Sequence, residues 1–381
     1  MSRLRGMTWD DPRGKAPLVA LGDRSGSLGQ TFVEWSTRSL QAFADLPLEE
    51  LAAEHDLLVI DHPHVPLVAG EGLLLPLDQH GPEDGLALLA TQSIGASYES
   101  YVHAGHVWAL PIDAAAQVSV CRPDLLGELP ATWEDVLELA RDGLVLWPTK
   151  PVDAMSSFLT LVSQQGGAVC AIWDEFVDRE LGLGVLELMC RLSELVPPAC
   201  LEENPIETAE HLASGSRYCY APLAFGYVNY SRAGFRPNRL AYRDIPRGLR
   251  GVAGSCLGGA GIAVSARSSH VAESVDVAYW LASAEIQRGA YYELGGQPAN
   301  AMAWEDPHVN ADCLEFFTGT RATLDGASLR PRESAWLGLQ DLIGDLVHET
   351  LSRRLDAEAC LERLDRAWQQ SSGTSTAGLQ R

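Results

Sequence analysis

The most informative stretch of the chain is residues 105–140, GHVWALPIDAAAQVSVCRPDLLGELPATWEDVLELA. Two short apolar segments, residues 108–112 and 117–121, predict two strands, and a turn at residues 122–126 leads away from them. Thr132 comes just before Glu134 and Asp135, a pattern typical of a helix start. The hydroxyl accepts a hydrogen bond from a free backbone amide, and the carboxylates favour the positive end of the helix dipole.

In its order and wording, this stretch resembles the crossing between the lobes of family 1 extracellular solute-binding proteins, the ligand receptors of sugar ABC importers. That family usually has a strand with a proline, a strand ending in Tyr-Asn-Lys, an Asp-Leu-Leu turn and then Pro-x-Thr-Trp-Glu. Here Cys121-Arg122-Pro123 replaces the usual Tyr-Asn-Lys. The glycine-rich segment at residues 257–265 resembles the family's return to the first lobe, and the likeness covers about residues 15–370. It implies a type 2 periplasmic-binding fold, with two hinged α/β lobes and an interlobe cleft that closes on a small polar ligand.

The length of 381 residues also favours two lobes, because it exceeds what one hydrophobic core normally supports. We expect lobe I at residues 1–112 and 258–312, lobe II at residues 113–257 and 313–370, and a disordered tail at residues 371–381. In lobe I, we predict a first strand at Leu18–Leu21, a helix over residues 39–55 and a buried strand over residues 56–61. In lobe II, we predict helices over residues 133–141, 152–165 and 171–195, a strand at residues 144–147, and a final helix pair over residues 332–370.

The composition is that of a soluble globular protein, with 46% hydrophobic residues and a formal net charge of −23. Such a charge argues against binding of nucleic acid or of an anionic membrane surface. No stretch approaches the roughly 20 apolar residues of a membrane span, so we expect no membrane insertion. The N-terminal residues lack the apolar region of a signal peptide, which predicts a cytoplasmic protein although the family is mostly exported.

The eight cysteines show neither CxxC pairing nor the spacing of zinc ligands, so we expect free thiols and no cofactor. Reduced thiols fit the cytosol better than an oxidising compartment. We also expect a monomer.

Asp61-His62-Pro63-His64 follows the predicted strand directly, and the carboxyl end of a parallel strand is where α/β proteins place ligand-binding groups. We predict ligand contact by Asp61, His62 and His64. The alternatives are a polar turn stiffened by Pro63, or a metal site. Metal binding is the weaker interpretation, because no other cluster of histidine, cysteine or aspartate has matching spacing.

Residues 9–14, WDDPRG, offer an aromatic ring and planar polar groups, which a sugar site needs for the ring and the hydroxyls of its ligand. In the alternative interpretation, Trp9 packs in the core and its neighbours cap a turn. Tyr227 and Asn229 lie beyond the predicted strand at residues 218–223, and Gly259 allows the backbone to approach a ligand. The predicted ligand-binding residues are Trp9, Asp10, Arg13, Asp61, His62, His64, Asp113, Tyr227, Asn229 and Gly259.

We therefore predict a solute-binding protein that takes a small polar, carbohydrate-like ligand for ABC-type uptake or for sensing, with an ABC permease as a partner. The alternative is a cytoplasmic enzyme of lyase, isomerase or hydrolase type that uses the same cleft as an active site. Its acids and bases would then be Asp61, His62, Asp113 and Tyr227. The sequence contains no GxSxG, HExxH or P-loop motif, which favours binding.

Overall fold

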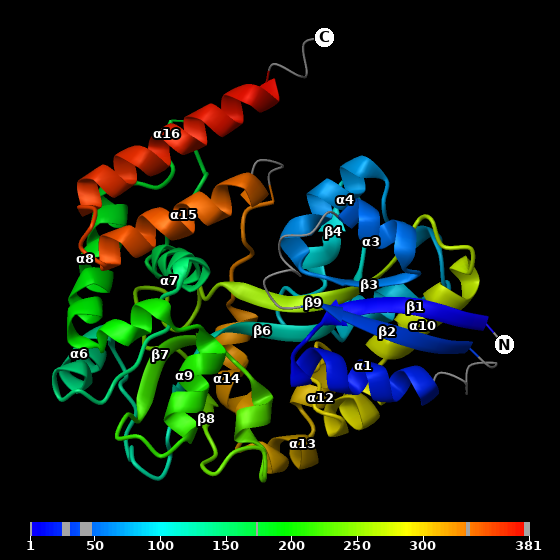
Figure 1. Cartoon of the computed structure of the whole chain (residues 1–381), viewed down its shortest axis with the longest axis horizontal. Helices are drawn as coiled ribbons and strands as arrows, with labels where there is room; N and C mark the ends of the chain where they lie inside the picture. The colour runs from blue at the N-terminus through cyan, green and yellow to red at the C-terminus, as the bar shows by residue number, and fades with distance from the viewer. Residues whose placement is uncertain (1, 25–30, 39–47, 173, 333–335, 377–381) are drawn as a thin grey trace. The chain divides into compact units, whose positions relative to one another are not determined.

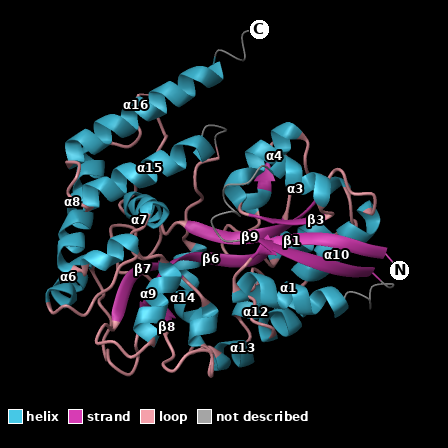
Figure 2. Ribbon diagram, in the orientation of Figure 1, coloured by secondary structure: helices cyan, strands magenta, loops and turns pink. Residues whose placement is uncertain are grey.

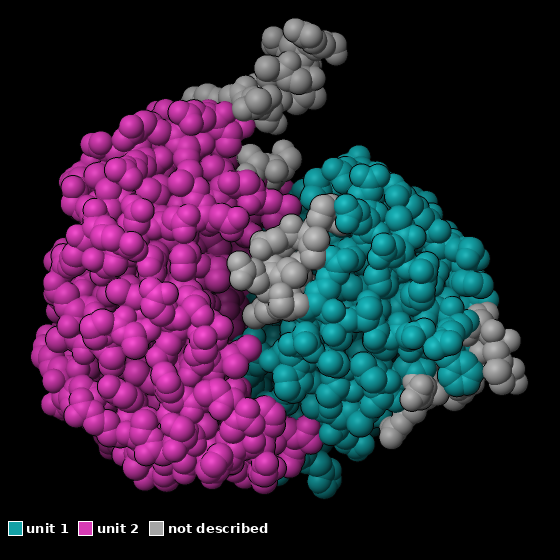
Figure 3. Space-filling model, in the orientation of Figure 1, with its two compact units in different colours: residues 1–115, 227–229, 258–311 teal, residues 116–226, 230–257, 312–381 magenta. Residues whose placement is uncertain are grey.

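The computed structural model describes residues 2–24, 31–38, 48–172, 174–332 and 336–376 (Figure 1). The chain divides into two compact units (Figure 3). Unit 1 comprises residues 1–115, 227–229 and 258–311, and unit 2 comprises residues 116–226, 230–257 and 312–381. Both units combine strands with helices (Figure 2), which confirms the predicted α/β class.

Unit 1 is built on a mostly parallel sheet. Its strands, in spatial order, are β2 (Thr31–Arg38), β1 (Ser2–Trp9), β3 (Leu57–Ile60), β9 (Leu257–Val264) and the first part of β6 (Leu110–Cys121). Strand β1 runs parallel to both β2 and β3, whereas β9 runs antiparallel to β3. A small hairpin is formed by β4 (Val102–His103) and β5 (His106–Val107).

Both faces of this sheet are buried. Along β3, Leu57 and Val59 belong to one hydrophobic cluster, and Leu58 and Ile60 belong to another. The first cluster includes residues of α1 and α10, and the second includes residues of α3 and α4, in agreement with the helices seen on either side of β3 in Figure 1. A strand covered on both sides must be apolar at every position, which explains the unbroken run at residues 57–60. The helices of unit 1 are α1 (Pro12–Arg24), α3 (Leu48–Glu54), α4 (Val65–Glu71), α5 (Gly85–Thr91), α10 (Val271–Ala282), α11 (Ala284–Ile286), α12 (Ala301–Trp304) and α13 (Pro307–Asp312), which begins there.

The prediction for the beginning of the chain is wrong. Residues 18–21 lie in helix α1, where Leu18 and Leu21 are three residues apart and both face the core. The first strand is β1, where exposed Arg3 and Arg5 alternate with buried Leu4, the period of a strand. Of the helix predicted over residues 39–55, α3 covers residues 48–54, and residues 39–47 lie outside the described part of the chain.

Unit 2 packs helices around β7 (Tyr220–Phe225) and β8 (Ala241–Arg243), which both run antiparallel to the second part of β6. The two strands predicted in the opening stretch are one continuous strand, β6, whose twelve residues are all buried. Polar side chains do not interrupt β6 because they form hydrogen bonds with buried groups, as Gln117 does by donating to the Ser157 hydroxyl. The helices of unit 2 are α6 (Trp133–Arg141), α7 (Pro151–Gln164), α8 (Arg179–Leu195), α9 (Pro205–Ala213), α14 (Phe316–Asp325), α15 (Trp336–Leu351) and α16 (Ala357–Thr376).

Helix α6 begins as predicted: Thr132 accepts a hydrogen bond from the Asp135 backbone, and the Asp135 carboxylate accepts one from the Thr132 backbone. Helix α8 begins at Arg179 rather than at residue 171, because the Asp178 side chain caps it. The predicted strand at residues 144–147 is reduced to one bridge, Val145 to Tyr220.

The chain end also differs from the prediction. Helix α16 continues to Thr376, so residues 371–376 are helical where disorder is predicted, and residues 377–381 lie outside the described part of the chain. Extending an existing helix by one residue costs little, so α16 can run past its last buried anchor, Trp368. Within the described residues, no helix combines the length and apolarity that crossing a membrane requires.

Candidate ligand-binding site

The residues predicted to bind ligand gather at one edge of the sheet in unit 1. Strands β1 and β3 are parallel, so the residues that follow Trp9 and Ile60 emerge at the same edge. Strand β9 runs the opposite way and pairs Gly261 with Ile60, which carries the preceding Gly259 to that edge too. The register of three strands thus brings distant parts of the sequence to one place.

Arg13, Asp113 and Tyr227 are in direct contact there, and all three are buried. Arg13 lies in the first turn of α1, and its Nη2 donates a 2.8 Å hydrogen bond to Oδ1 of Asp113. The guanidinium carbon lies 4.4 Å from the centre of the Tyr227 ring, a cation–π distance. The three side chains therefore form one buried polar cluster, which we name the Arg13 cluster.

Burial dominates the electrostatics of this cluster. It raises the pKa of Asp113, and the adjacent Arg13 opposes that rise, whereas the nearby Asp11 and Asp61 add to it. Burial also raises the pKa of Tyr291, to which Asp113 contributes. Neither Oδ2 of Asp113 nor the Tyr291 hydroxyl has a hydrogen-bond partner among the described residues. A buried polar atom without a partner costs about 1–3 kcal/mol, so a water or a ligand hydroxyl bound at these atoms would be stabilised.

Gly259 is close to the same carboxylate for a steric reason. Its φ of 116° lies in a region that residues with side chains rarely adopt, and a Cβ there would collide with the Asp113 carbonyl oxygen. Glycine at this position lets β9 approach β6 closely.

Asp61, His62 and His64 form a compact turn after β3. Asp61 caps the short helix at His62–His64, accepting a 2.8 Å hydrogen bond from the His62 backbone, and its Oδ1 lies 3.2 Å from Nδ1 of His62. Nδ1 of His64 lies 3.2 Å from the Asp61 carbonyl oxygen. The polar turn stiffened by Pro63 is therefore present. Over the described ranges, no three or more histidine, cysteine or acidic side chains are placed to hold a metal ion.

The remaining predicted residues differ in their surroundings. Trp9 is 4% exposed and belongs to the hydrophobic core, where any Cβ on Gly14 would collide with its ring, so the packing interpretation fits it. Asp10 is exposed and pairs with Lys15 at 3.0 Å. Asn229 is buried in the same short segment as Tyr227.

Unit 2 contains a second set of buried polar groups, which the sequence analysis missed. One face of α7 carries Asp153, Ser157, Thr160 and Gln164, all nearly inaccessible to solvent. Ser157 and Thr160 bind the Gln117 side chain, and Gln164 accepts from Trp133. The signal was visible in the sequence as polar residues at helical spacing in an otherwise apolar helix.

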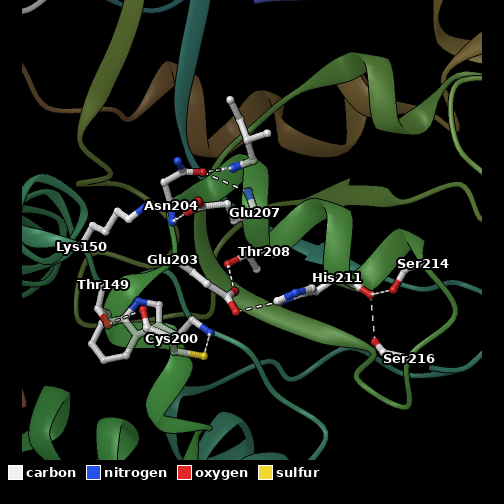
Figure 4. Close-up of polar contacts among 12 residues, drawn as sticks. Thr149, Lys150, Cys200, Glu203, Asn204, Glu207, Thr208, His211, Ser214 and Ser216 are labelled. Carbon is white, nitrogen blue, oxygen red and sulfur yellow. Dashed lines mark hydrogen bonds and ion pairs between the residues drawn. The ribbon is translucent and has the colours of Figure 1, made fainter. Parts of the chain in front are cut away.

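Asp153 is the exception on this face. It is 3% exposed, and its Oδ2 has no partner among the described residues. Burial raises its pKa to about 8, although Lys150 opposes the rise. Lys150 itself is occupied by a 2.7 Å ion pair with Glu207 (Figure 4).

Further polar contacts surround the ion pair of Lys150 and Glu207 (Figure 4). Glu203 accepts a hydrogen bond from the Thr208 hydroxyl, and its other carboxylate oxygen lies 2.8 Å from Nδ1 of His211, while Asn204 caps helix α9. Two further unpartnered atoms in the described part of unit 2, Nε1 of Trp336 and Oε1 of Gln340, lie on α15, which packs along α7.

No protein-family model matches the sequence. Solved structures do match the whole chain. A maltose-bound MalE3 from T. maritima has a TM-score of 0.81 at 17% identity, with 97% of this chain and 99% of that chain covered. An ABC transporter solute-binding protein from Agrobacterium radiobacter, in complex with ribitol, has a TM-score of 0.82 at 18% identity, with 97% and 98% covered. The acarbose-binding GacH receptor of Streptomyces glaucescens has a TM-score of 0.79 at 18% identity, also with 97% and 98% covered.

The chain has the fold of the sugar-binding solute-binding proteins. This confirms the fold expected from residues 105–140. At 17–18% identity the likeness is one of fold, and the ligands named above belong to those proteins.

Proposed function

We propose that this protein is a solute-binding protein for a small polar, carbohydrate-like ligand, and that it serves ABC-type uptake or sensing. Two observations support this proposal. Proteins of the same fold bind maltose, ribitol and acarbose. The observation that carries the proposal is a pair of buried polar atoms without a hydrogen-bond partner among the described residues, Oδ2 of Asp113 within the Arg13 cluster and the hydroxyl of Tyr291.

The chemistry of these groups suits a polyhydroxylated ligand. Each sugar hydroxyl can donate one hydrogen bond and accept others, so it can satisfy a carboxylate oxygen and a phenol at once. Asp61 provides a carboxylate that is 26% exposed and accessible to a ligand from solvent. We propose Asp61, His62, His64, Tyr227 and Asn229 as ligand-contacting residues, with Arg13 and Gly259 positioning Asp113.

We further propose that the two compact units act as the two hinged lobes, with residues 113–115 and 227–229 in the first lobe and residue 312 in the second, unlike the bounds expected from the sequence. We also propose that the protein works as a monomer that hands its ligand to an ABC permease. Small-angle scattering with and without ligand tests the hinge, since closing reduces the radius of gyration. An unchanged radius in a saturated sample would contradict it.

The proposed ligand class is tested by thermal unfolding with maltose, ribitol, α-D-tagatose and acarbose. A ligand at a hundredfold excess over its Kd stabilises the native state by about 2.7 kcal/mol. Asp61→Ala should weaken binding by about tenfold or more, as expected for the loss of a charged hydrogen-bond acceptor. Glu34→Ala, which removes an exposed carboxylate that pairs with Arg3, is the matched control and should leave the Kd unchanged.

The recovered small molecule then separates binding from catalysis. After incubation and denaturation, mass and NMR spectra identical to those of the input support a binding protein. A converted molecule, with conversion lost in Asp61→Ala or His62→Ala while affinity is kept, would instead support the enzyme. Native mass spectrometry of protein from its own host would identify the natural ligand.

A further inference from the structure

Unit 2 contains a cavity of about 370 Å³ whose lining includes none of the residues proposed above to contact a ligand. It is lined by the end of helix α7, the turn that follows it, the segment before β9 and the segment after α14. A volume of this size falls at the lower end of the range for small-molecule sites, about 300–1,000 Å³. The lining residues are Leu159, Val162, Ser163, Gly167, Ala168, Val169, Arg250, Gly254, Cys256, Ser328, Leu329, Arg330 and Pro331.

One part of the lining is basic and rich in hydroxyl groups. Nη1 of Arg250 lies 3.3 Å from the Ser163 carbonyl oxygen and 3.4 Å from its hydroxyl. The Ser163 hydroxyl in turn lies 2.6 Å from that of Ser328. Arg330 also lines the cavity and is only 9% exposed. These lining residues include two arginines and no acid, in a chain whose formal net charge is −23.

The rest of the lining is apolar. Leu159 and Val162 come from α7, and Leu329 and Pro331 from the segment after α14. A cavity lined by apolar side chains and by two arginines matches a ligand that has an apolar body and one charged oxygen group. Guanidinium is the side-chain group best suited to carboxylate and phosphate, because its N–H groups form a planar fork.

We propose that this cavity binds a small organic oxyanion, an apolar body that carries a carboxylate or a phosphate. The oxyanion lies against Arg250, Arg330 and the serine hydroxyls, and the apolar body lies against the leucine and valine side chains.

The backbone around the cavity connects it to the segment through which the chain passes from unit 2 to unit 1. Cys256 immediately precedes β9, and its backbone N–H donates to the Thr160 hydroxyl at 2.9 Å. The Leu257 N–H donates to the Ser328 carbonyl oxygen at 2.9 Å. Arg250 precedes this segment in the chain, and Ser328 is hydrogen-bonded to it through Leu257. A ligand held by Arg250 and Ser328 should therefore reduce local opening of the segment.

Arg250 also has a simpler role, which the test must separate from ligand binding. By donating to the Ser163 carbonyl oxygen, it satisfies a carbonyl in the last turn of α7, as basic side chains commonly do at helix C-termini. Capping involves Arg250 alone, whereas the paired hydroxyls of Ser163 and Ser328 line the same cavity together with Arg330.

Isothermal titration of the full chain at low salt with four probes tests the proposal: benzoate, phenyl phosphate, inorganic phosphate and benzyl alcohol. Benzoate or phenyl phosphate should bind, and the neutral benzyl alcohol should bind at least about tenfold more weakly, as expected for the loss of a charge-assisted contact. Comparing benzoate with phenyl phosphate separates carboxylate from phosphate, and inorganic phosphate shows whether the apolar body is needed.

Arg250→Ala and Ser328→Ala should each weaken the binding of the better probe, the former by about tenfold. Arg191→Ala, which removes an exposed arginine paired with Glu134 in the same unit, is the matched control and should leave the Kd unchanged. Hydrogen exchange should show probe-dependent protection at residues 250–258 and 326–332.

Three results would overturn the proposal. They are no heat from any probe at about 10 mM, equal affinity for benzoate and benzyl alcohol, or unchanged affinity in Arg250→Ala despite a lower melting temperature. The last result would leave Arg250 as a helix cap only. Because Arg250 is exposed, its variant is expected to fold, and Ser328→Ala keeps the test decisive if it does not.

Discussion

The contact between Arg13 and Asp113 is a buried ion pair of unit 1. Their side chains are 7% and 0% exposed, so neither charge is screened by solvent. Removing one partner from a buried ion pair leaves the other charge without compensation, which typically costs about 3–5 kcal/mol. The pair therefore holds the start of α1 against β6.

We predict that Arg13→Ala lowers the free energy of unfolding by about 3–5 kcal/mol in urea denaturation, because it leaves the Asp113 carboxylate buried and unpaired. It also removes the stacking on Tyr227. Lys15→Ala breaks the exposed pair with Asp10 in the same helix and should change stability by less than about 1 kcal/mol. A similar effect of the two substitutions would show that the Arg13 pair does not constrain the fold.

A second residue-scale prediction concerns Asp153, whose pKa is raised by burial to about 8 in the folded protein. In the unfolded chain an aspartate titrates near pH 3.9. Between about pH 4 and pH 8 the folded state binds more protons than the unfolded state, so this group makes stability fall as the pH rises. Asp153→Asn should remove that slope and become more stable relative to the wild type from pH 5 to pH 8.

Urea denaturation at several pH values measures the Asp153 effect. Asp142→Asn, at the exposed end of α6, is the matched control and should follow the wild-type curve. If the Asp153→Asn curve stays parallel to the wild-type curve over this range, the carboxyl is ionised in the folded protein.

At the scale of elements, the sequence predicted a helix or strand correctly where neighbouring residues alone determine it. Thr132 and Asp135 predict the start of α6 because a capping box needs only neighbouring residues. The apolar run at residues 57–60 predicts a strand buried on both faces. By contrast, Asp113 reads as a break in β6, because its buried partner Arg13 lies far away in the sequence.

Strand β9 depends on glycine where it approaches β6. We predict that Gly259→Ala destabilises the protein by more than about 2 kcal/mol, because its positive φ is strained for alanine and the added Cβ would meet the Asp113 carbonyl oxygen. Gly70→Ala in helix α4 is the control, since its Cβ would meet no atom within 4 Å. Thermal unfolding should show that the control is unchanged or slightly more stable, given the higher helix propensity of alanine. Equal melting temperatures for both variants would contradict the close approach.

At the scale of the molecule, the order of elements along the chain allowed the fold to be predicted from residues 105–140 and 257–265, and the structural matches agree with it. The candidate site was harder to predict, because the surroundings of each side chain depend on residues that are distant in the sequence. The sequence leaves Trp9 open as a ring for a sugar or as a core residue, and the structure packs it against Gly14. Asp153, Trp336 and Gln340 were missed, because only packing of α7 against α15 shows which of their polar atoms remain unpaired.

The distribution of the cysteines gives a prediction for the whole chain. All eight are thiols; six are buried, and Cys170 and Cys190 are partly buried. Burial raises the pKa of Cys121 to about 11 and of Cys200 to about 12, which suppresses the reactive thiolate at neutral pH.

In the native protein at pH 8, Ellman's reagent should therefore react promptly with at most the two partly buried thiols, and in guanidinium chloride with all eight. Prompt reaction of more than two native thiols would show that the units open readily, and fewer than eight in denaturant would reveal a disulfide. A ligand that stabilises the native state should slow the reaction of the buried thiols further, because exposing them requires opening.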